Sequence, residues 1–248
     1  MLLKKTLITF WSLLFLTGCA AVSTKEDPLE LVNRPIYYFN RIIDVSFVRP
    51  VSKAYDIVTP QPIKFGVTNI FSNMLQVPTA ANELLQGKPS QALSSLGRFS
   101  INATLGLAGI FDVATELGYD YQLEDFGQTL AVWGWKESTY FVMPIFGPST
   151  IRDTIGFIGS LYMTVPYYTL NKGELNLYYS IGWVDYRRRF KDLELIVGNA
   201  GVDHYSFVRA SFLQNRRFNI NDGSTIEALG ATQNFSGLSS NLLEEPPE

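Results

Sequence analysis

Residues 154–171 read TIGFIGSLYMTVPYYTLN and contain no charged side chain. Residues 99–111 and 138–151 are two further stretches without charge. Glycines and prolines interrupt all three, so none is an unbroken apolar span of about 20 residues, the length that a transmembrane helix needs. Broken helices are tolerated at membrane depth where protein covers their backbone or where it lines a water-filled cavity. The pattern predicts a bundle of broken helices partly sunk in one membrane leaflet, with polar groups turned inward. The alternative is a soluble core rich in glycine and aromatic rings.

Upstream of these stretches the sequence predicts an amphipathic helix. Asp27 is its expected N-cap, and Glu30 is expected to reach back to the start of the helix. Pro35 predicts a kink or a restart of the helix, with Asn33 as a second cap. Apolar residues recur at spacings of three and four, which is typical of an apolar stripe along one side of a helix. They are Leu29, Val32, Ile36, Phe39 and Ile43.

Most of the remaining chain is also predicted to be helical. Prolines at helix starts and a glycine after a helix end mark several boundaries. No segment alternates apolar and polar residues for long, so strands are expected to be scarce and the fold class all-α. Residues 27–220 are the predicted helical domain, and residues 221–248 a disordered tail. The expected helices are 63–74, 78–87, 89–99, 149–162 with Ser149 as N-cap, 175–197 and 205–217.

The composition limits the classes of function. The 248 residues are 46% hydrophobic, 14% aromatic and 17% charged. An average soluble protein is roughly 25% charged, so this bias fits contact with lipid or an apolar cavity. The formal net charge of −3 argues against binding nucleic acid, which needs a basic face. A single His and a single Cys exclude Cys–His zinc sites, disulfides and most imidazole catalysis, and we expect no metal site.

The N-terminus has the pattern of a lipoprotein signal. A short basic start precedes a mostly apolar run at residues 7–16, which is too short to span a membrane. Leu16-Thr17-Gly18-Cys19 resembles the lipobox of bacterial lipoproteins, which implies diacylation of Cys19. Residues 1–18 are then the signal peptide and residues 19–26 a lipidated tether. In the sorting rule that this resemblance implies, a residue other than Asp after the cysteine favours the outer membrane, and Ala20 follows it.

Candidate catalytic residues are few. His204 is the only imidazole, and no Gly-x-Ser-x-Gly motif supplies a nucleophile, so we expect a surface or capping His. Residues 187–191 form a basic run, which is either a solvated helix face or a handle for phosphate headgroups. Paired carboxylates are what glycoside hydrolysis needs, although solvated acidic loops are commoner. The candidates are Glu116, Asp120, Glu124 and Asp125.

Many short motifs, in order along the chain, resemble the MlaA/VacJ family of outer-membrane lipoproteins. The resemblance is strong over residues 27–153, weakens near residues 205–212, and is lost over residues 162–189. Each motif is weak alone, but their number and order are specific. They are Asp27-Pro28-Leu29-Glu30, Asn33-Arg34, Tyr38-Phe39-Asn40, Asp44, Val48-Arg49-Pro50-Val51, Pro60-Gln61-Pro62 with Gly66, Asn69 and Phe71, Leu85-Gln86-Gly87-Lys88-Pro89, Arg98-Phe99, Asn102, Leu105-Gly106, Gly109-Ile110-Phe111-Asp112, Glu124-Asp125-Phe126-Gly127-Gln128-Thr129-Leu130, Pro144-Ile145-Phe146-Gly147-Pro148-Ser149 and Arg152-Asp153.

The resemblance implies a helical ring in the inner leaflet of the outer membrane, with an amphipathic channel and in association with trimeric porins. It implies a non-enzymatic function without a cofactor. That function is the removal of phospholipids misplaced in the outer leaflet and their delivery to a soluble periplasmic carrier, MlaC, which maintains lipid asymmetry. The protein is then expected at the outer membrane, lipid-anchored on the periplasmic side.

The resemblance extends to a small set of site residues. Cys19 corresponds to the lipid anchor. Phe39 and Asn40 fall in a motif whose helix is thought to control the channel. Phe39 equally fits a residue of the apolar stripe, and Asn40 equally fits an amide on the helix surface. Four more motif residues are expected to line or brace the channel, and equally fit a buried ion pair and helix caps. They are Arg98, Asn102, Arg152 and Asp153.

Two other functions stay open on the sequence. A lipoprotein enzyme would act on peptidoglycan or lipid through the carboxylates between Glu116 and Asp125. A purely structural outer-membrane lipoprotein would need neither a channel nor catalysis.

Overall fold

The computed structural model describes residues 27–190 and 203–223. The predicted signal peptide, Cys19 with its tether, and the tail beyond residue 223 lie outside these ranges. Within them the chain is helical except for one two-stranded sheet. The elements are α2 (Glu30–Ile43), the π-helix η1 (Asp44–Val48), α3 (Arg49–Val58), α4 (Gln61–Met74), α5 (Gln76–Leu85), α6 (Pro89–Thr104), α7 (Val113–Glu116), α8 (Phe126–Val132), β1 (Tyr140–Met143), β2 (Gly147–Thr150), α9 (Ile151–Leu161), α10 (Val165–Thr169), α11 (Lys172–Arg189) and α13 (His204–Ile220).

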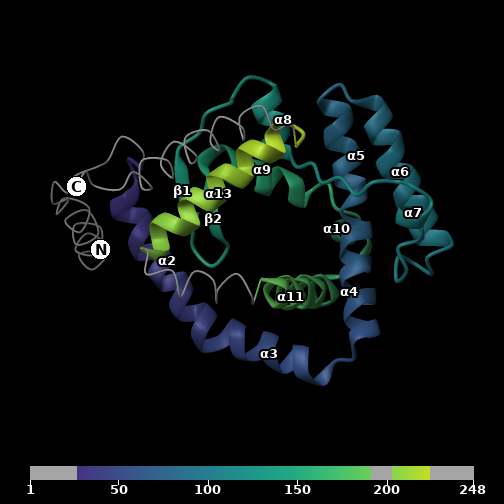
Figure 1. Ribbon diagram of the computed structural model, residues 1–248, viewed down its shortest axis with the longest axis horizontal. Helices are drawn as coiled ribbons and strands as arrows, with labels where there is room; N and C mark the ends of the chain where they lie inside the picture. Colours follow the sequence, from purple (N-terminus) through teal and green to yellow (C-terminus); the bar gives the residue numbers. More distant parts are fainter. Residues whose placement is uncertain (1–26, 191–202, 224–248) are drawn as a thin grey trace, which may run out of the picture.

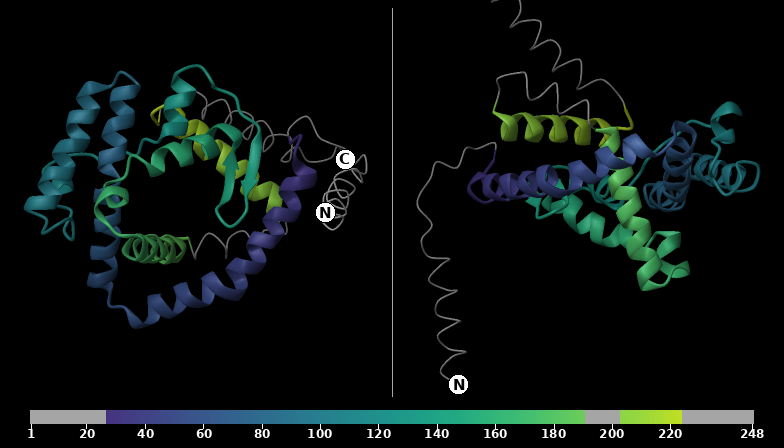
Figure 2. Two further views of the ribbon diagram at one scale, coloured as in Figure 1. Left: turned by 180° about the vertical axis from the view of Figure 1, so that it is seen from behind. Right: turned by 90° about the horizontal axis from the view of Figure 1, so that it is seen from below.

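These elements close into a ring (Figure 1). Helices α2, η1 and α3 form one side, α4 the next, and α8, α9 and the β1–β2 hairpin the opposite side, while α5, α6 and α7 extend outward. Helix α13 packs on α8 and β2 at one face of the ring, whereas α10 and α11 project from the other face (Figure 2). The helical ring implied by the resemblance is therefore confirmed. Its placement in a membrane leaflet stays a prediction.

The β1–β2 hairpin is an element that the sequence pattern did not predict. Its strands pair antiparallel, with Tyr140 opposite Thr150 and Met143 opposite Gly147. Each strand has four residues, which is too short for an alternating pattern to be recognised. The connecting turn needs a positive φ at Ile145 (72°) and at Gly147 (92°). Glycine adopts this conformation readily, whereas a β-branched isoleucine adopts it only where its surroundings hold it there.

Helix α2 differs from its prediction at three points. It continues through Pro35 as one helix, so the predicted restart is wrong. Leu29 occupies the N-cap position instead of Asp27, which is buried. Asn33 is not a second cap, because its side chain binds β1. Hydrogen bonds from asparagines on both sides of Pro35 fix the helix to the hairpin.

Two later helices also have different boundaries from those predicted. Thr150, rather than Ser149, is the N-cap of α9, and Ser149 is buried in β2. Helix α11 begins at Lys172, where Asn171 forms a capping box, earlier than the predicted start at residue 175. The part of that predicted helix beyond residue 190 lies outside the described residues.

Helices α8 and α9 pack with their backbones in contact. A Cβ atom on Gly156 would lie 2.4 Å from the backbone nitrogen of Gly127, so only glycine fits at this crossing. A Cβ atom on Gly127 would likewise lie 2.4 Å from Asp153 Oδ1. This close approach brings the N-terminus of α8 against the carboxylate of α9.

The distribution of side chains is the reverse of that in a water-soluble protein. Over residues 27–190 and 203–223, nine apolar or tyrosine side chains are buried, against 19 polar or charged ones, and 44 large apolar or aromatic side chains are exposed. Soluble proteins rarely bury charged groups or expose large contiguous apolar patches. Within the same ranges, no helix has both the length and the apolar character that crossing a bilayer would require. The exposed apolar side chains therefore lie on a ring of shorter helices.

Candidate functional site: the polar interior of the ring

Asn33 and Asp27 form a buried polar cluster between α2, β1 and α13. Asn33 Nδ2 donates to the Tyr140 carbonyl (3.0 Å), and its Oδ1 accepts from the Val142 amide (2.9 Å). The same Nδ2 lies 3.2 Å from Asp27 Oδ1. The Tyr205 hydroxyl donates to the other Asp27 oxygen. Asn33 thus pairs with the backbone of β1 as a neighbouring strand would. The bond between Tyr205 and Asp27 holds α13 to the N-terminal end of the ring.

Asn40, a predicted channel residue, repeats this arrangement seven residues later. Its Nδ2 donates to the Met143 carbonyl (2.9 Å), and its Oδ1 accepts from the Ile145 amide (2.7 Å). Residues seven apart lie on one face of a helix, so both asparagines bind the hairpin, and this one holds Ile145 at its positive φ. The neighbouring Phe39 faces elsewhere, with 51% of its surface exposed. The two predicted residues of this motif therefore lie in different surroundings.

Arg98 and Asn102 converge on Asp112 and join α6 to α7. Arg98 is only 3% exposed, and its guanidinium lies 2.6 Å from Asp112 Oδ2. Asn102 Nδ2 donates to Asp112 Oδ1 (3.0 Å), and its Oδ1 accepts from the Ala114 amide (2.9 Å). Burial alone would raise the pKa of Asp112, but hydrogen bonds from Thr115, Asn102 and Arg98 lower it below its usual range. The carboxylate is therefore ionised and fully engaged.

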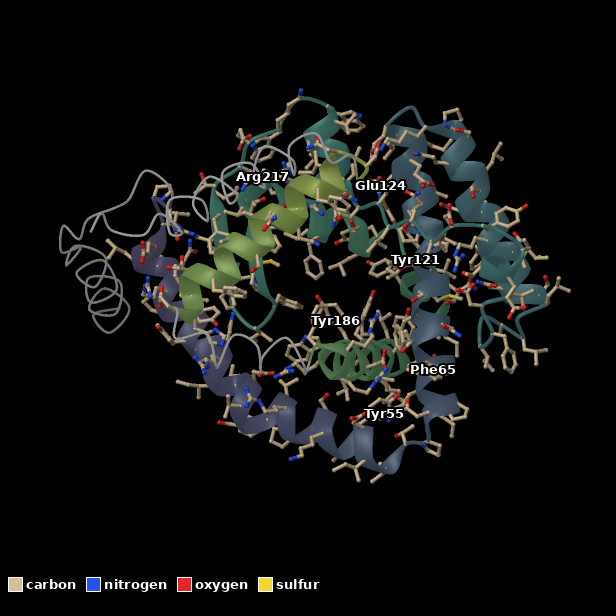
Figure 3. The ribbon with its side chains drawn as sticks, in the orientation of Figure 1. Tyr55, Phe65, Tyr121, Glu124, Tyr186 and Arg217 are labelled. Carbon is tan, nitrogen blue, oxygen red and sulfur yellow. The ribbon has the colours of Figure 1, made fainter. Side chains whose placement is uncertain are left out.

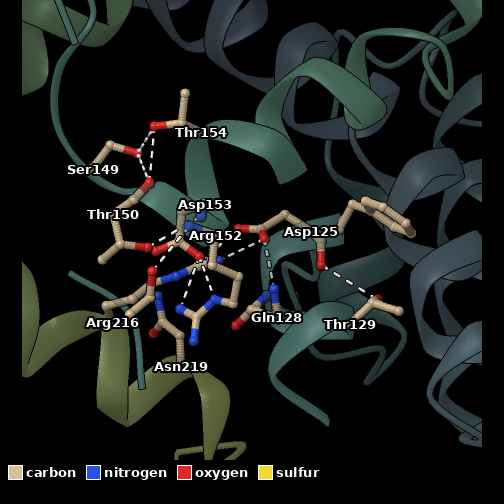
Figure 4. A network of polar contacts seen from close by, with 12 residues as sticks. Asp125, Gln128, Thr129, Ser149, Thr150, Arg152, Asp153, Thr154, Arg216 and Asn219 are labelled. Carbon is tan, nitrogen blue, oxygen red and sulfur yellow. Dashed lines mark hydrogen bonds and ion pairs between the residues drawn. The ribbon is translucent and has the colours of Figure 1, made fainter. Parts of the chain in front are cut away.

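A second network joins α8, α9 and α13 (Figure 4). Arg152 is 2% exposed, donates to two backbone carbonyls of the loop after α8 (2.8 and 3.1 Å), and binds Asp153 (2.9 Å). Arg216 of α13 donates to Asp153 (2.9 Å) and to both oxygens of Asp125 (2.6 and 2.7 Å). Burial would raise the pKa of Asp125, but Arg216 overrides this and lowers it. Four charged groups thus fasten α13 across the α8–α9 crossing.

The predicted channel residues therefore form separate clusters instead of one site. Asn40 lies at the hairpin, the Arg98 cluster lies in the α6–α7 group, and the Arg152 cluster lies where α8, α9 and α13 meet (Figure 1). All except Phe39 have hydrogen-bond partners that hold one element to another. Their placement fits bracing of the ring.

The acidic residues weighed for catalysis have different surroundings. Glu124 is buried, accepts from Gln86 Nε2 (2.8 Å) and lies 3.5 Å from Lys88 Nζ. Burial raises its pKa, although Gln86 and Lys88 oppose the shift. Asp125, its neighbour in sequence, binds Arg216 instead. The other two, Glu116 and Asp120, are exposed, so the four carboxylates do not share one set of partners.

The basic run at the end of α11 forms ion pairs. Arg187 binds both oxygens of Asp44 in η1 (2.6 and 2.9 Å). Arg188 lies 2.9 Å from Asp185, which also accepts from Thr68 of α4. Figure 3 shows that Tyr186, on the same helix, projects into the region that the ring encloses. These arginines fix α11 to the neighbouring sides of the ring.

Some residues of this interior were not predicted from the sequence. Arg216 lies 91 residues from its partner Asp125 in the sequence, so no local sequence pattern predicts this ion pair. His204, predicted as a surface or capping residue, is the first residue of α13 after the N-cap Asp203. Its contact was not predicted: the ring is hydrogen-bonded to the Tyr37 hydroxyl, and burial lowers the pKa of His204. In the ranges that the structure describes, no group of His, Cys, Asp and Glu side chains is arranged to hold a metal ion.

Comparisons with known proteins agree on one family. A family model described as "MlaA lipoprotein" matches residues 25–219. The Intermembrane phospholipid transport system lipoprotein MlaA of Haemophilus influenzae is 33% identical over 237 residues, which cover 90% of this chain and 94% of that protein. The protein of the same name from Escherichia coli K12 is 31% identical, covering 84% and 85%. A solved structure described as the structural basis for maintenance of bacterial outer membrane lipid asymmetry is 28% identical with a TM-score of 0.70, covering 79% of this chain and 100% of that one.

Proposed function

The chain belongs to the MlaA lipoprotein family, and on that premise we propose that it removes mislocalised phospholipids from the outer leaflet of the outer membrane. The phospholipids pass through an amphipathic channel to a periplasmic carrier, and lipid asymmetry is maintained. The names of the relatives and the description of the similar solved structure support this function, because the similarity in sequence and fold extends over most of the chain.

The observation that carries the proposal is the reversed distribution of polar and apolar side chains. A phospholipid that changes leaflet needs a polar path for its headgroup and an apolar surface for its tails. The ring supplies the apolar surface, because many of its large apolar side chains are exposed, and its buried side chains, which are mostly polar, hold together the ring through which we propose that the headgroup passes. We propose that the ring lies in the inner leaflet with its apolar exterior toward the acyl chains and with Cys19 as its lipid anchor.

The predicted site residues keep a role in this proposal. Their hydrogen bonds favour bracing the channel over contacting lipid, except for the exposed Phe39. These site residues are Phe39, Asn40, Arg98, Asn102, Arg152 and Asp153.

The proposed partners are phospholipid, a MlaC-like periplasmic carrier and a trimeric porin of the outer membrane.

The enzyme hypothesis has no independent support. An acid–base pair needs two carboxylates placed around one substrate bond. Glu124 and Asp125 bind different partners, and a bidentate arginine occupies both oxygens of Asp125. The family is a component of lipid transport.

Complementation tests the proposed function. The full chain is expressed in a strain that lacks its MlaA-type lipoprotein, and phosphatidylethanolamine at the cell surface is labelled with a membrane-impermeant amine reagent. We expect the chain to restore low surface labelling, and Glu124→Gln and Asp125→Asn variants of normal abundance to do the same. Unchanged labelling with the wild-type chain would contradict transport, and loss of rescue only in the two carboxylate variants would favour catalysis.

Cys19 gives a separate prediction about anchoring. A Cys19→Ser variant has no sulfur to acylate, and two acyl chains are what makes attachment stable. We expect the variant in the soluble periplasmic fraction or in the inner membrane, whereas the wild-type chain fractionates with the outer membrane. Retention of the variant in the outer membrane would show that other contacts hold the protein there.

A further inference from the structure

The arginines of the ring differ in whether they have an acidic partner. Within residues 27–190 and 203–223, nine of the eleven arginines lie within 4.0 Å of an Asp or Glu oxygen. In the same part of the chain, Arg41 and Arg217 have no such ion pair. Both are exposed. A guanidinium without a carboxylate is available to another anion.

Arg41 lines a hollow. Arg41 borders a space of about 370 Å³ on α2 and η1, together with Tyr38, Ile42, Val45 and Ser46. Ligand pockets typically measure about 300–1,000 Å³. This hollow is shallow and largely open to its surroundings, and its volume is sufficient for a headgroup but not for a whole phospholipid. Its two hydroxyls and its guanidinium are all hydrogen-bond donors.

Helical spacing explains why most of these side chains share one face of the helix. Residues 38, 41, 42 and 45 are three or four apart, which places them on one helix face. Ser46 follows Ile42 by four residues and lies in the π-helix η1. Single π turns inside α-helices occur frequently at functional sites.

We propose that this hollow binds the phosphate of a phospholipid headgroup, with Arg41 as the anion-binding group and with Tyr38 and Ser46 donating further hydrogen bonds. The proposal rests on the proposed function and names a lipid contact for it. The planar guanidinium matches two phosphate oxygens at once. A membrane lipid is favoured over free phosphate because Ile42 is 64% exposed and Val45 is 45% exposed beside the cation, which provides an apolar wall for the first carbons of the tails.

A binding measurement with purified full-length protein in a nonionic detergent tests the site. The probes are phosphatidylglycerol, diacylglycerol with the same acyl chains, and inorganic phosphate, and bound lipid is counted by mass spectrometry. We expect Arg41→Gln to weaken phosphatidylglycerol binding roughly tenfold, as loss of one charge-assisted bidentate contact predicts, and to leave diacylglycerol binding unchanged. Arg41→Lys keeps the positive charge but lacks the two parallel N–H donors of the guanidinium, so its affinity for phosphatidylglycerol should lie between those of the wild type and Arg41→Gln.

Arg217→Gln is the matched control, because Arg217 is also exposed, also without an ion pair within the described residues, and outside the hollow. It should bind phosphatidylglycerol like the wild type. Equal binding by Arg41→Gln, or an equal loss in Arg217→Gln, overturns the proposal. Displacement of phosphatidylglycerol by an equal concentration of inorganic phosphate also overturns it, in favour of a site for free phosphate.

Complementation separates this inference from the proposed function. If the wild-type chain restores lipid asymmetry and Arg41→Gln retains wild-type binding, the function stands and the inference fails. If the wild-type chain does not restore asymmetry, the proposed function fails, whatever the binding data show. Urea unfolding in the same detergent confirms that the variant is folded, which we expect because the Arg41 side chain is exposed and makes no ion pair within the described ranges.

Discussion

Glu83 of α5 is fully buried, and neither of its carboxylate oxygens has a well-formed hydrogen bond. Burial raises its pKa, and the nearby Glu124 charge adds to the shift, while Ser95 and Lys88 oppose it. The folded state therefore holds the Glu83 proton more tightly than the unfolded state does. Its unfavourable contribution to stability grows as the pH rises above the unfolded value of about 4.3.

Glu83→Gln should stabilise the protein at neutral pH, because it removes a buried charge and keeps the size of the side chain. We expect a gain of roughly 1 kcal/mol in the free energy of unfolding, measured by urea titration in detergent at pH 7.5. The gain should shrink toward pH 4.5, where the wild-type carboxyl becomes protonated. A gain of the same size at both pH values would contradict this account.

At the scale of elements, the hairpin depends on α2. Asn33 completes the hydrogen bonding of one strand carbonyl and one strand amide, both buried. Asn33→Ala leaves both groups unpaired, and we expect a loss of roughly 2–4 kcal/mol in unfolding free energy. Asn176→Ala, at an exposed position of α11, is the control and should change stability by less than about 0.5 kcal/mol. Equal losses in the two variants would show that the Asn33 contacts contribute little.

The same contacts explain which elements the sequence could predict. Helices α4 and α6 follow from local spacing and from prolines at their starts, so their positions were close to those predicted. The hairpin depends on side chains 103 and 107 residues away in sequence, which no local pattern contains. Asn33 and Asn40 were recognised within motifs, but a motif does not state which strand an amide binds.

At the scale of the whole molecule, Arg216 fastens α13 to the rest of the ring. Replacing it with Gln leaves Asp125 and Asp153 without their shared cation, which we expect to cost roughly 2–4 kcal/mol of stability. Hydrogen–deuterium exchange should become faster across α13. Arg217→Gln, one residue along the same helix, should leave exchange as in the wild type. Unchanged exchange in Arg216→Gln would mean that other contacts fix the helix.

The apolar exterior also has a consequence for how the sequence can drift. Lipid tails accept many side-chain shapes, so exchanges among leucine, isoleucine, valine and phenylalanine on the rim should be nearly neutral. At the asparagines that bind the hairpin, even a change to leucine, which has a similar size, loses the hydrogen bonds of the side-chain amide. Substitutions should therefore accumulate quickly on the apolar exterior and slowly among the buried polar side chains, whereas in a water-soluble protein the slowly changing interior is apolar.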